Sequence, residues 1–100
     1  MDESYFPTVL QAVAGKNKTV YAYFSDGSIR LYDVKPLIAR GNIFTHLEDD
    51  DFFRNRLTVL NDTVAWDLSG NYDPANCIDI DPLTIYEESE LVSDPLEEVV

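Results

Sequence analysis

Short apolar stretches separated by polar turns run along the chain, a pattern typical of a small domain built from strands and short helices. Residues 5–14 are apolar and partly β-branched, and we expect the first strand there. Two further pairs of apolar stretches flank the dipeptides Asp26-Gly27 and Asn61-Asp62, which favour the tight loops of β-hairpins. The pattern therefore predicts one strand followed by two hairpins, over residues 20–34 and 56–67.

The first hairpin is predicted to close on Asp26 and Gly27 as its two loop residues. This register pairs Tyr21 with Tyr32 and Tyr23 with Arg30. Because side chains alternate between the two faces of a strand, these four side chains share one amphipathic face. The opposite face is apolar and is expected to join the core. It carries Val20, Ala22, Phe24, Ile29 and Leu31.

In the second hairpin, a two-residue loop at positions 61 and 62 places Leu57 opposite Trp66 and Val59 opposite Val64. All four side chains are apolar and lie on one face. We expect this stripe, with Trp66 at one end, to be buried.

Three short helical segments are indicated by their end signals. Pro36 and Gly41 are typical of the first turn and the end of a helix over the segment VKPLIARGN. One of Asp49, Asp50 and Asp51 is expected to cap a helix that holds Phe52 and Phe53. Asp81 and Pro82 suit the start of a third helix, and the turn-forming residues 69–77 are predicted to be a loop.

These elements predict an α+β fold, with an antiparallel sheet from two β-hairpins plus a further strand and with two or three short helices. A chain of 100 residues with 45% hydrophobic content is enough for one core. We expect a single domain over residues 1–90. Residues 91–100 are acidic and have little apolar surface to bury, so they are predicted to be a frayed C-terminal tail.

The net charge of −12 is unevenly distributed. Residues 79–100 contain eight acids and no base, whereas residues 1–78 contain eleven acids and seven bases. A negative chain is repelled by phosphate, so we expect no direct nucleic-acid binding. The chain has no long apolar run and its first residues do not resemble a signal peptide, so we expect a cytoplasmic protein without membrane contact.

The order of elements resembles the domain-of-unknown-function family 2442. The resemblance rests on the stretch FSDGSIRLYDVKPLI, on Phe44, Leu47 and Phe52, and on the later stretches TVAWD and IDIDPLTIYEES, and it covers roughly residues 8–88. The longer loop after Trp66 and the acidic tail depart from the family pattern. The resemblance implies an α+β domain without established activity or catalytic residues, sometimes fused to a helix-turn-helix domain and sometimes encoded beside a small partner in toxin-antitoxin-like pairs.

Two groups of acids are the candidates for a cation site, because Ca²⁺ and Mg²⁺ prefer carboxylate oxygens. The first group is Glu48, Asp49, Asp50 and Asp51, and the second is Asp73, Asp79 and Asp81. Consecutive acids rarely converge on one point, and the spacing of a calcium-binding loop is missing. We therefore interpret the first group as a capped, solvated helix start and Asp81 as a helix cap, and we expect no metal and no cofactor.

His46 and Cys77 are the remaining candidates for chemistry. His46 is the only imidazole and has no recognisable catalytic partner in the sequence. Cys77 is the only cysteine, so it cannot form a disulfide within the chain, and no local motif marks it as a nucleophile. We expect a surface histidine, a thiol without catalytic function and a protein that is not an enzyme.

The amphipathic face is the candidate binding surface, because tyrosine and arginine are enriched at the energetic centres of protein interfaces. The alternative is that residues 5–14 or a helix cover it. We expect a non-catalytic protein-interaction module, an adaptor or antitoxin-like component that binds another protein or itself through Tyr21, Tyr23, Arg30 and Tyr32, with the acidic tail attracting a basic partner.

Two other functions stay open. One is a small ligand-sensing domain, although a chain of this length is expected to leave little room for a pocket of about 300 Å³. The other is a small metal-dependent hydrolase that uses the aspartate groups.

Overall fold

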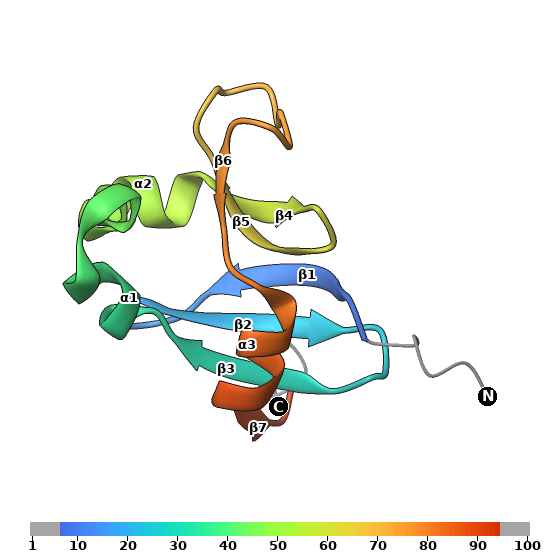
Figure 1. The fold of residues 1–100 in the computed structure, drawn as a ribbon. Coiled ribbons are helices and arrows are strands. Elements are labelled where there is room, and N and C mark those ends of the chain that lie inside the picture. The colour runs from blue at the N-terminus through green and yellow to red at the C-terminus, as the bar shows by residue number, and fades with distance from the viewer. Residues whose placement is uncertain (1–6, 95–100) are drawn as a thin grey trace.

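The computed structural model describes residues 7–94 and shows an α+β protein with two antiparallel sheets (Figure 1). This confirms the predicted fold class. One sheet contains, in spatial order, β1 (Val9–Ala14), β2 (Thr19–Phe24), β3 (Ile29–Asp33) and β7 (Glu90–Val92). The other contains β4 (Leu57–Leu60), β5 (Thr63–Asp67) and β6 (Cys77–Asp79). The helices are α1 (Lys35–Arg40), the 3-10 helix η1 (Asn42–Glu48), α2 (Asp50–Asn55) and α3 (Pro82–Glu88).

The two predicted hairpins belong to different sheets, and each sheet gains a strand that the sequence pattern does not predict. β6 pairs with β5, so Cys77 belongs to a strand and not to the predicted loop. β7 pairs with β3 and includes Leu91 and Val92. The predicted end of the domain at residue 90 is therefore corrected to include this strand. Residues 95–100 of the predicted tail, like residues 5 and 6 of the predicted first strand, lie outside the described residues.

One core fills the space between the sheets and the helices. Figure 1 shows the second sheet and α2 on one side of β1, β2 and β3. β1 links the sheets, because the Val9 N–H donates to the Asp62 carbonyl oxygen at 3.0 Å. The buried apolar side chains come from both sheets and from η1, α2 and α3, and the largest fully buried ones are Trp66, Phe53, Leu47, Ile78 and Ile85.

Trp66 lies at the centre of this core. Its side chain is 0% exposed, its ring centroid is 5.3 Å from that of Phe53, and its indole Nε1–H donates to the Phe53 carbonyl oxygen at 2.9 Å. β4 and β5 have the predicted register, with Leu57 opposite Trp66 and Val59 opposite Val64. Asn61 and Asp62 both have positive φ, of 56° and 63°, as a tight two-residue hairpin loop requires.

The helices begin and end where their capping residues predict. The Asp49 carboxylate accepts hydrogen bonds from the backbone N–H groups of Asp51 and Phe52 and so caps α2. Asp81 caps α3 through the Leu83 N–H. The N–H of Gly41 donates to Ile38 at the end of α1. The segment between α1 and α2 is the 3-10 helix η1, which buries Leu47.

The first hairpin is one residue out of the predicted register. The Phe24 N–H donates to the Ser28 carbonyl oxygen at 2.9 Å, so the loop contains Ser25, Asp26 and Gly27. The Asp26 carboxylate accepts from the Ser28 N–H at 2.9 Å, and Gly27 has a φ of 90°, which favours glycine. Val20 pairs with Tyr32, Ala22 with Arg30 and Tyr23 with Ile29.

This shift of one residue exchanges the two faces of β3, because side chains alternate along a strand. Tyr32 joins the core beside Val20 and is 5% exposed. Ile29 and Leu31, which are predicted to be core residues, lie on the other face beside Tyr23 and Tyr21.

The hairpin loop also makes the stability of the protein depend on pH, through the carboxyl group of Asp26. The pKa of the Asp26 carboxyl is lowered from 3.8 to about 2, because the hydroxyls of Ser28 and Tyr86 donate to it at 2.6 and 2.7 Å. A carboxyl with a lowered pKa stabilises the folded state above its unfolded pKa, and this contribution is lost as the pH falls from about 4 to about 2. We expect the difference in unfolding free energy between the native chain and Asp26→Asn, measured by urea denaturation, to shrink over that range. A difference that is constant down to pH 2 would contradict this assignment.

Candidate functional site

The four residues of the predicted binding face do not lie together. Tyr21 and Tyr23 are on the outer face of the first sheet, the face opposite the core. Tyr32 is buried on the inner face. Arg30 is also on the inner face, where its guanidinium lies 3.9 Å from the centroid of the Tyr86 ring and donates to the Tyr86 carbonyl oxygen at 3.2 Å. The predicted face is therefore corrected, because the three-residue loop moves Arg30 and Tyr32 to the core side.

A different apolar cluster occupies the outer face of the first sheet. The pairing of Val13 with Tyr21 and of Tyr21 with Leu31 places these three side chains in one row across the strands. Tyr23, Ile29 and Val92 form a second row. All six side chains are half-buried. We call them the outer-face cluster: Val13, Tyr21, Tyr23, Ile29, Leu31 and Val92.

The chain returns to this face after β7. The Tyr23 hydroxyl donates to the Asp94 carboxylate at 2.7 Å. Tyr23 lies on β2, whereas β7 pairs with β3, so the segment that follows β7 crosses β3 to reach its neighbour. Asp94 thus places an acid near the hairpin end of the outer-face cluster.

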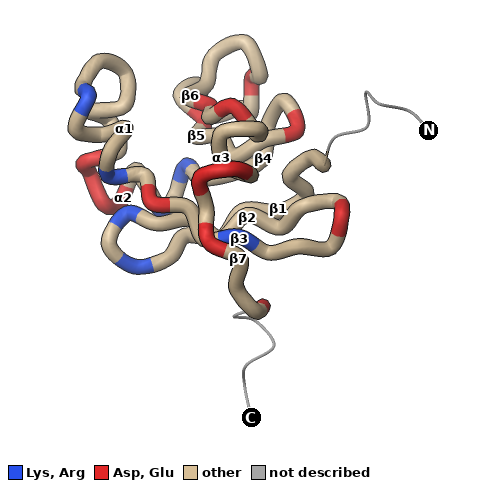
Figure 2. The backbone as a smooth tube through the Cα atoms, turned by 60° about the horizontal axis from the view of Figure 1, so that its bottom comes forward, with Lys and Arg blue, Asp and Glu red and all other residues tan. Residues whose placement is uncertain are grey.

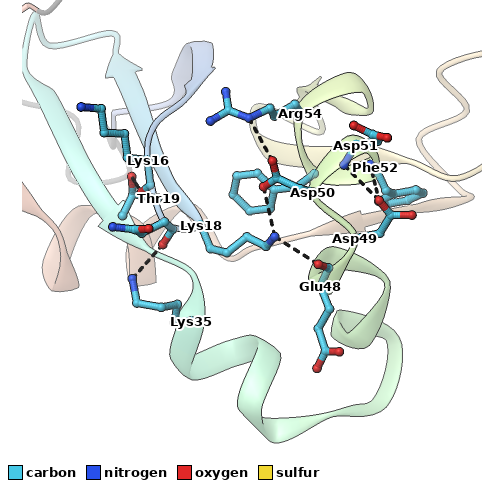
Figure 3. A network of polar contacts seen from close by, with 12 residues as sticks. Lys16, Lys18, Thr19, Lys35, Glu48, Asp49, Asp50, Asp51, Phe52 and Arg54 are labelled. Atoms are coloured by element: carbon cyan, nitrogen blue, oxygen red, sulfur yellow. Dashed lines mark hydrogen bonds and ion pairs between the residues drawn. The ribbon is translucent and has the colours of Figure 1, made fainter.

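Four of the seven basic residues gather at the opposite end of β2, around the turn between β1 and β2 (Figure 3). We call them the cationic end: Lys16, Lys18, Lys35 and Arg54. In Figure 2 most basic positions likewise lie toward α1 and α2. The turn itself is left-handed at Asn17 and Lys18, with φ values of 55° and 61°.

Polar contacts hold the cationic end against α1 and α2. Lys18 Nζ donates to the Glu48 carbonyl oxygen at 3.1 Å and to the Asp50 carboxylate at 3.2 Å. Arg54 pairs with the same carboxylate at 3.5 Å. Lys35 Nζ donates to the Asn17 carbonyl oxygen at 2.8 Å and pairs with Asp33 at 3.0 Å. Donation from Lys18 holds the pKa of Asp50 below its usual range.

The cationic end and the outer-face cluster are parts of one surface. An open depression of about 650 Å³ is lined by Tyr21 and Leu31 from the cluster and by Lys16, Lys35 and Arg54 from the cationic end. Lys16 is exposed and has no ion-pair partner within residues 7–94. The basic segment Lys16-Asn17-Lys18 is visible in the sequence, but its position beside Tyr21 and Leu31 depends on the register of the first hairpin.

Several of the acidic residues that could hold a cation are engaged by donors of the protein itself. Asp50 pairs with Lys18 and Arg54. Asp73 accepts from the Ala75 N–H, and Asp79 accepts from the Asn61 side-chain amide. Within the described part of the chain, no group of three or more histidine, cysteine, aspartate or glutamate side chains is placed to hold a metal ion.

His46 and Cys77 occupy unrelated positions. His46 is exposed in η1, with its ring 5.8 Å from that of Phe52. Cys77 is half-buried in β6, and its Sγ lies 3.6 Å from the Pro74 carbonyl oxygen. Burial raises the pKa of the Cys77 thiol, and the charges of Asp79, Asp67 and Asp73 raise it further. This environment favours the thiol over the nucleophilic thiolate.

Within residues 7–94, Asp67 is the one buried carboxyl, and its hydrogen bonds hold the loop before β6. Its carboxylate accepts from the N–H and hydroxyl of Ser69 and from the Tyr72 N–H, each at 3.1 Å. Burial alone would raise the pKa of Asp67, but these hydrogen bonds outweigh burial and lower it. These hydrogen bonds give Asp67 a structural role in holding the loop that contains Ser69 and Tyr72.

Comparison with protein families, curated proteins and solved structures finds no match for this chain. The resemblance to family 2442 stays a prediction from the sequence. Within residues 7–94, no helix is long and apolar enough to cross a membrane.

Proposed function

We propose that the chain is a non-catalytic, cytoplasmic protein-interaction module, an adaptor or antitoxin-like component, and that it associates through the outer face of the β1-β2-β3-β7 sheet. The outer-face cluster supports this proposal, because it gathers six apolar side chains on one side of a sheet whose other side packs on the core. Contiguous apolar surface of this kind is typical of interaction sites. The raised pKa of the Cys77 thiol supports a role that does not use this cysteine as a nucleophile.

A second copy of this chain is the partner whose charges fit the surface best. The cationic end lies beside Gly15 at one end of β2. Asp94, beside Tyr23, lies at the other end. In a two-fold dimer that stacks the outer faces with their strands antiparallel, the cationic end of each copy lies over the acidic end of its partner.

The area of the outer face is small for a stable interface, so the charged ends must also contribute to dimerisation. Four strands spaced by about 4.8 Å, with about five residues of 3.3 Å each, give a face of roughly 300 Å². Stable complexes bury about 800 Å² on each partner. The apolar cluster alone is therefore too small, and association should depend on the charged ends and weaken with salt.

We expect sedimentation equilibrium to show a dimer at low ionic strength that dissociates as salt is added. The double substitution Tyr21→Ser with Leu31→Ser should weaken dimerisation at least about tenfold, because interface centres commonly contribute 1–2 kcal/mol or more for each residue. The matched control is Tyr72→Ser, which changes an exposed tyrosine in the loop before β6 and should leave the dimer unchanged. Circular dichroism should show that all variants are folded.

Two outcomes would overturn the proposal of self-association. One is a monomer at low salt up to the highest concentration that stays in solution. The other is a dimer that the double substitution leaves unchanged while the Tyr72 variant disrupts it, which would place the contact at the second sheet.

A further inference from the structure

A pocket of about 400 Å³ lies on the other side of the molecule from the outer-face cluster, between α1, β6 and α3. Its apolar wall comes from Leu37 on α1, Phe44 on η1 and Ile80 just after β6. Figure 1 shows that β6 leads directly into α3, and residues from the end of β6 through α3 line the pocket. A volume of this size is within the range of small-molecule sites. The expectation that the chain leaves little room for a pocket is therefore wrong.

Tyr32 supplies a buried polar group to this pocket. Its side chain is 5% exposed and lines the pocket, and its hydroxyl forms no hydrogen bond within residues 7–94. In the same range, Ser89 Oγ is the one fully enclosed side-chain atom without a partner, so the Tyr32 hydroxyl retains access to the pocket. Water in the pocket reaches this hydroxyl, so a molecule that enters the pocket can take the place of that water as its hydrogen-bond partner. This hydroxyl therefore indicates where a ligand would bind.

The charges around the hydroxyl indicate the sign of the ligand. Four carboxylates and one guanidinium line the pocket. Three of the carboxylates, those of Asp33, Asp79 and Asp81, already accept hydrogen bonds from the protein. Glu88, on the last turn of α3, accepts none within the described part of the chain. A lining with this excess of negative charge favours a cation.

The charged groups Glu88 and Arg40 both act on the Tyr32 hydroxyl. Burial raises the pKa of Tyr32, the charge of Glu88 raises it further and the charge of Arg40 lowers it. The hydroxyl therefore stays protonated at neutral pH and offers oxygen lone pairs to a donor. Phe44 adds an aromatic ring, and aromatic rings attract ammonium groups.

We propose that this pocket binds a small organic cation, a primary ammonium with an apolar body. Its N–H groups donate to the Tyr32 hydroxyl oxygen and to the Glu88 carboxylate. Its hydrocarbon part contacts Leu37, Phe44 and Ile80. The site lies apart from the outer-face cluster, so it adds a ligand-binding function to the proposed interaction module.

The test is a titration of the full chain with 2-phenylethylammonium chloride, followed by NMR chemical shifts. Saturable shifts are expected at residues around α1 and α3. The neutral analogue 2-phenylethanol should bind at least about tenfold more weakly, because hydrogen bonds to charged groups contribute about 1.5–3 kcal/mol and each 1.4 kcal/mol is a factor of ten.

Two variants test the polar groups. Glu88→Gln should weaken binding of the ammonium about fourfold, because Glu88 is exposed and solvent screens its charge. Tyr32→Phe, which keeps the buried ring, should weaken it several-fold. The matched control is Glu87→Gln, which removes the same charge from the neighbouring position of α3 outside the pocket and should change the affinity less than about twofold. Thermal unfolding should show that the three variants are folded.

The proposal is overturned if the ammonium gives no saturable shifts, or if the alcohol binds as tightly as the ammonium. It is also overturned if Glu87→Gln and Glu88→Gln weaken binding equally, because the cation would then respond only to the net charge of the protein.

Discussion

Trp66→Ala is expected to unfold the domain or to leave it barely stable. Trp66 is fully buried, contacts Phe53 and donates to its carbonyl oxygen. Truncating a buried tryptophan costs about 3–5 kcal/mol, whereas a whole domain is stable by about 5–15 kcal/mol. The lost indole also leaves a buried carbonyl oxygen without its donor. Urea denaturation, monitored by circular dichroism, measures the difference in unfolding free energy between this variant and the native chain.

Tyr72→Ala provides the control for this substitution. Tyr72 is 62% exposed, and changes at exposed positions shift stability by about 0.5 kcal/mol. The native chain should also show blue-shifted tryptophan emission that quenchers do not reach. A Trp66→Ala variant within 1 kcal/mol of the native chain would show that Trp66 is not in the core.

Tyr32→Ser is expected to lower the free energy of unfolding by about 3 kcal/mol, whereas Tyr21→Ser should lower it by less than about 1 kcal/mol. Tyr32 is 5% exposed on the core side of β3, and Tyr21 is half-buried on the outer face. Urea denaturation at low protein concentration separates this effect from dimerisation, since association also stabilises the folded state. Equal losses for the two variants would restore the register in which both tyrosines share one face.

The difference between the two hairpins shows what the sequence could predict. Asn61 and Asp62 are both able to take positive φ, so the two-residue loop and the register of the second hairpin follow directly. Of the stripe predicted to be buried, Val64 and Trp66 are buried, whereas Leu57 and Val59 are half-buried. Asp26-Gly27 permits two loops. The Asp26 carboxylate binds the Ser28 N–H and selects the longer loop. The predicted binding face failed for this reason, because one residue of register decides which side chains meet.

The helices were predictable because their caps are local. Asp49, Asp81 and Gly41 act within their own turns, whatever the rest of the chain does. β6 and β7 contain three residues each, too few for an alternating pattern to be recognised, and they depend on partners far away in the sequence. The pocket at Tyr32 brings together residues from α1, η1, β6 and α3, so no local signal could have indicated it.

The short strand β7 controls whether the edge of β3 is covered or exposed. It covers the edge of β3 over the pairs from Ile29 to Leu31, and its partner lies about sixty residues earlier in the chain. β7 contains three residues, and Glu90 and Leu91 are exposed, so few buried contacts hold it in place. We expect it to be released in local fluctuations while the hairpins stay intact. Each release uncovers unpaired N–H and C=O groups along β3. The same edge then pairs with β7 of another molecule when the protein is concentrated enough to compete with the chain's own strand, so the native fold carries a route to strand exchange between copies.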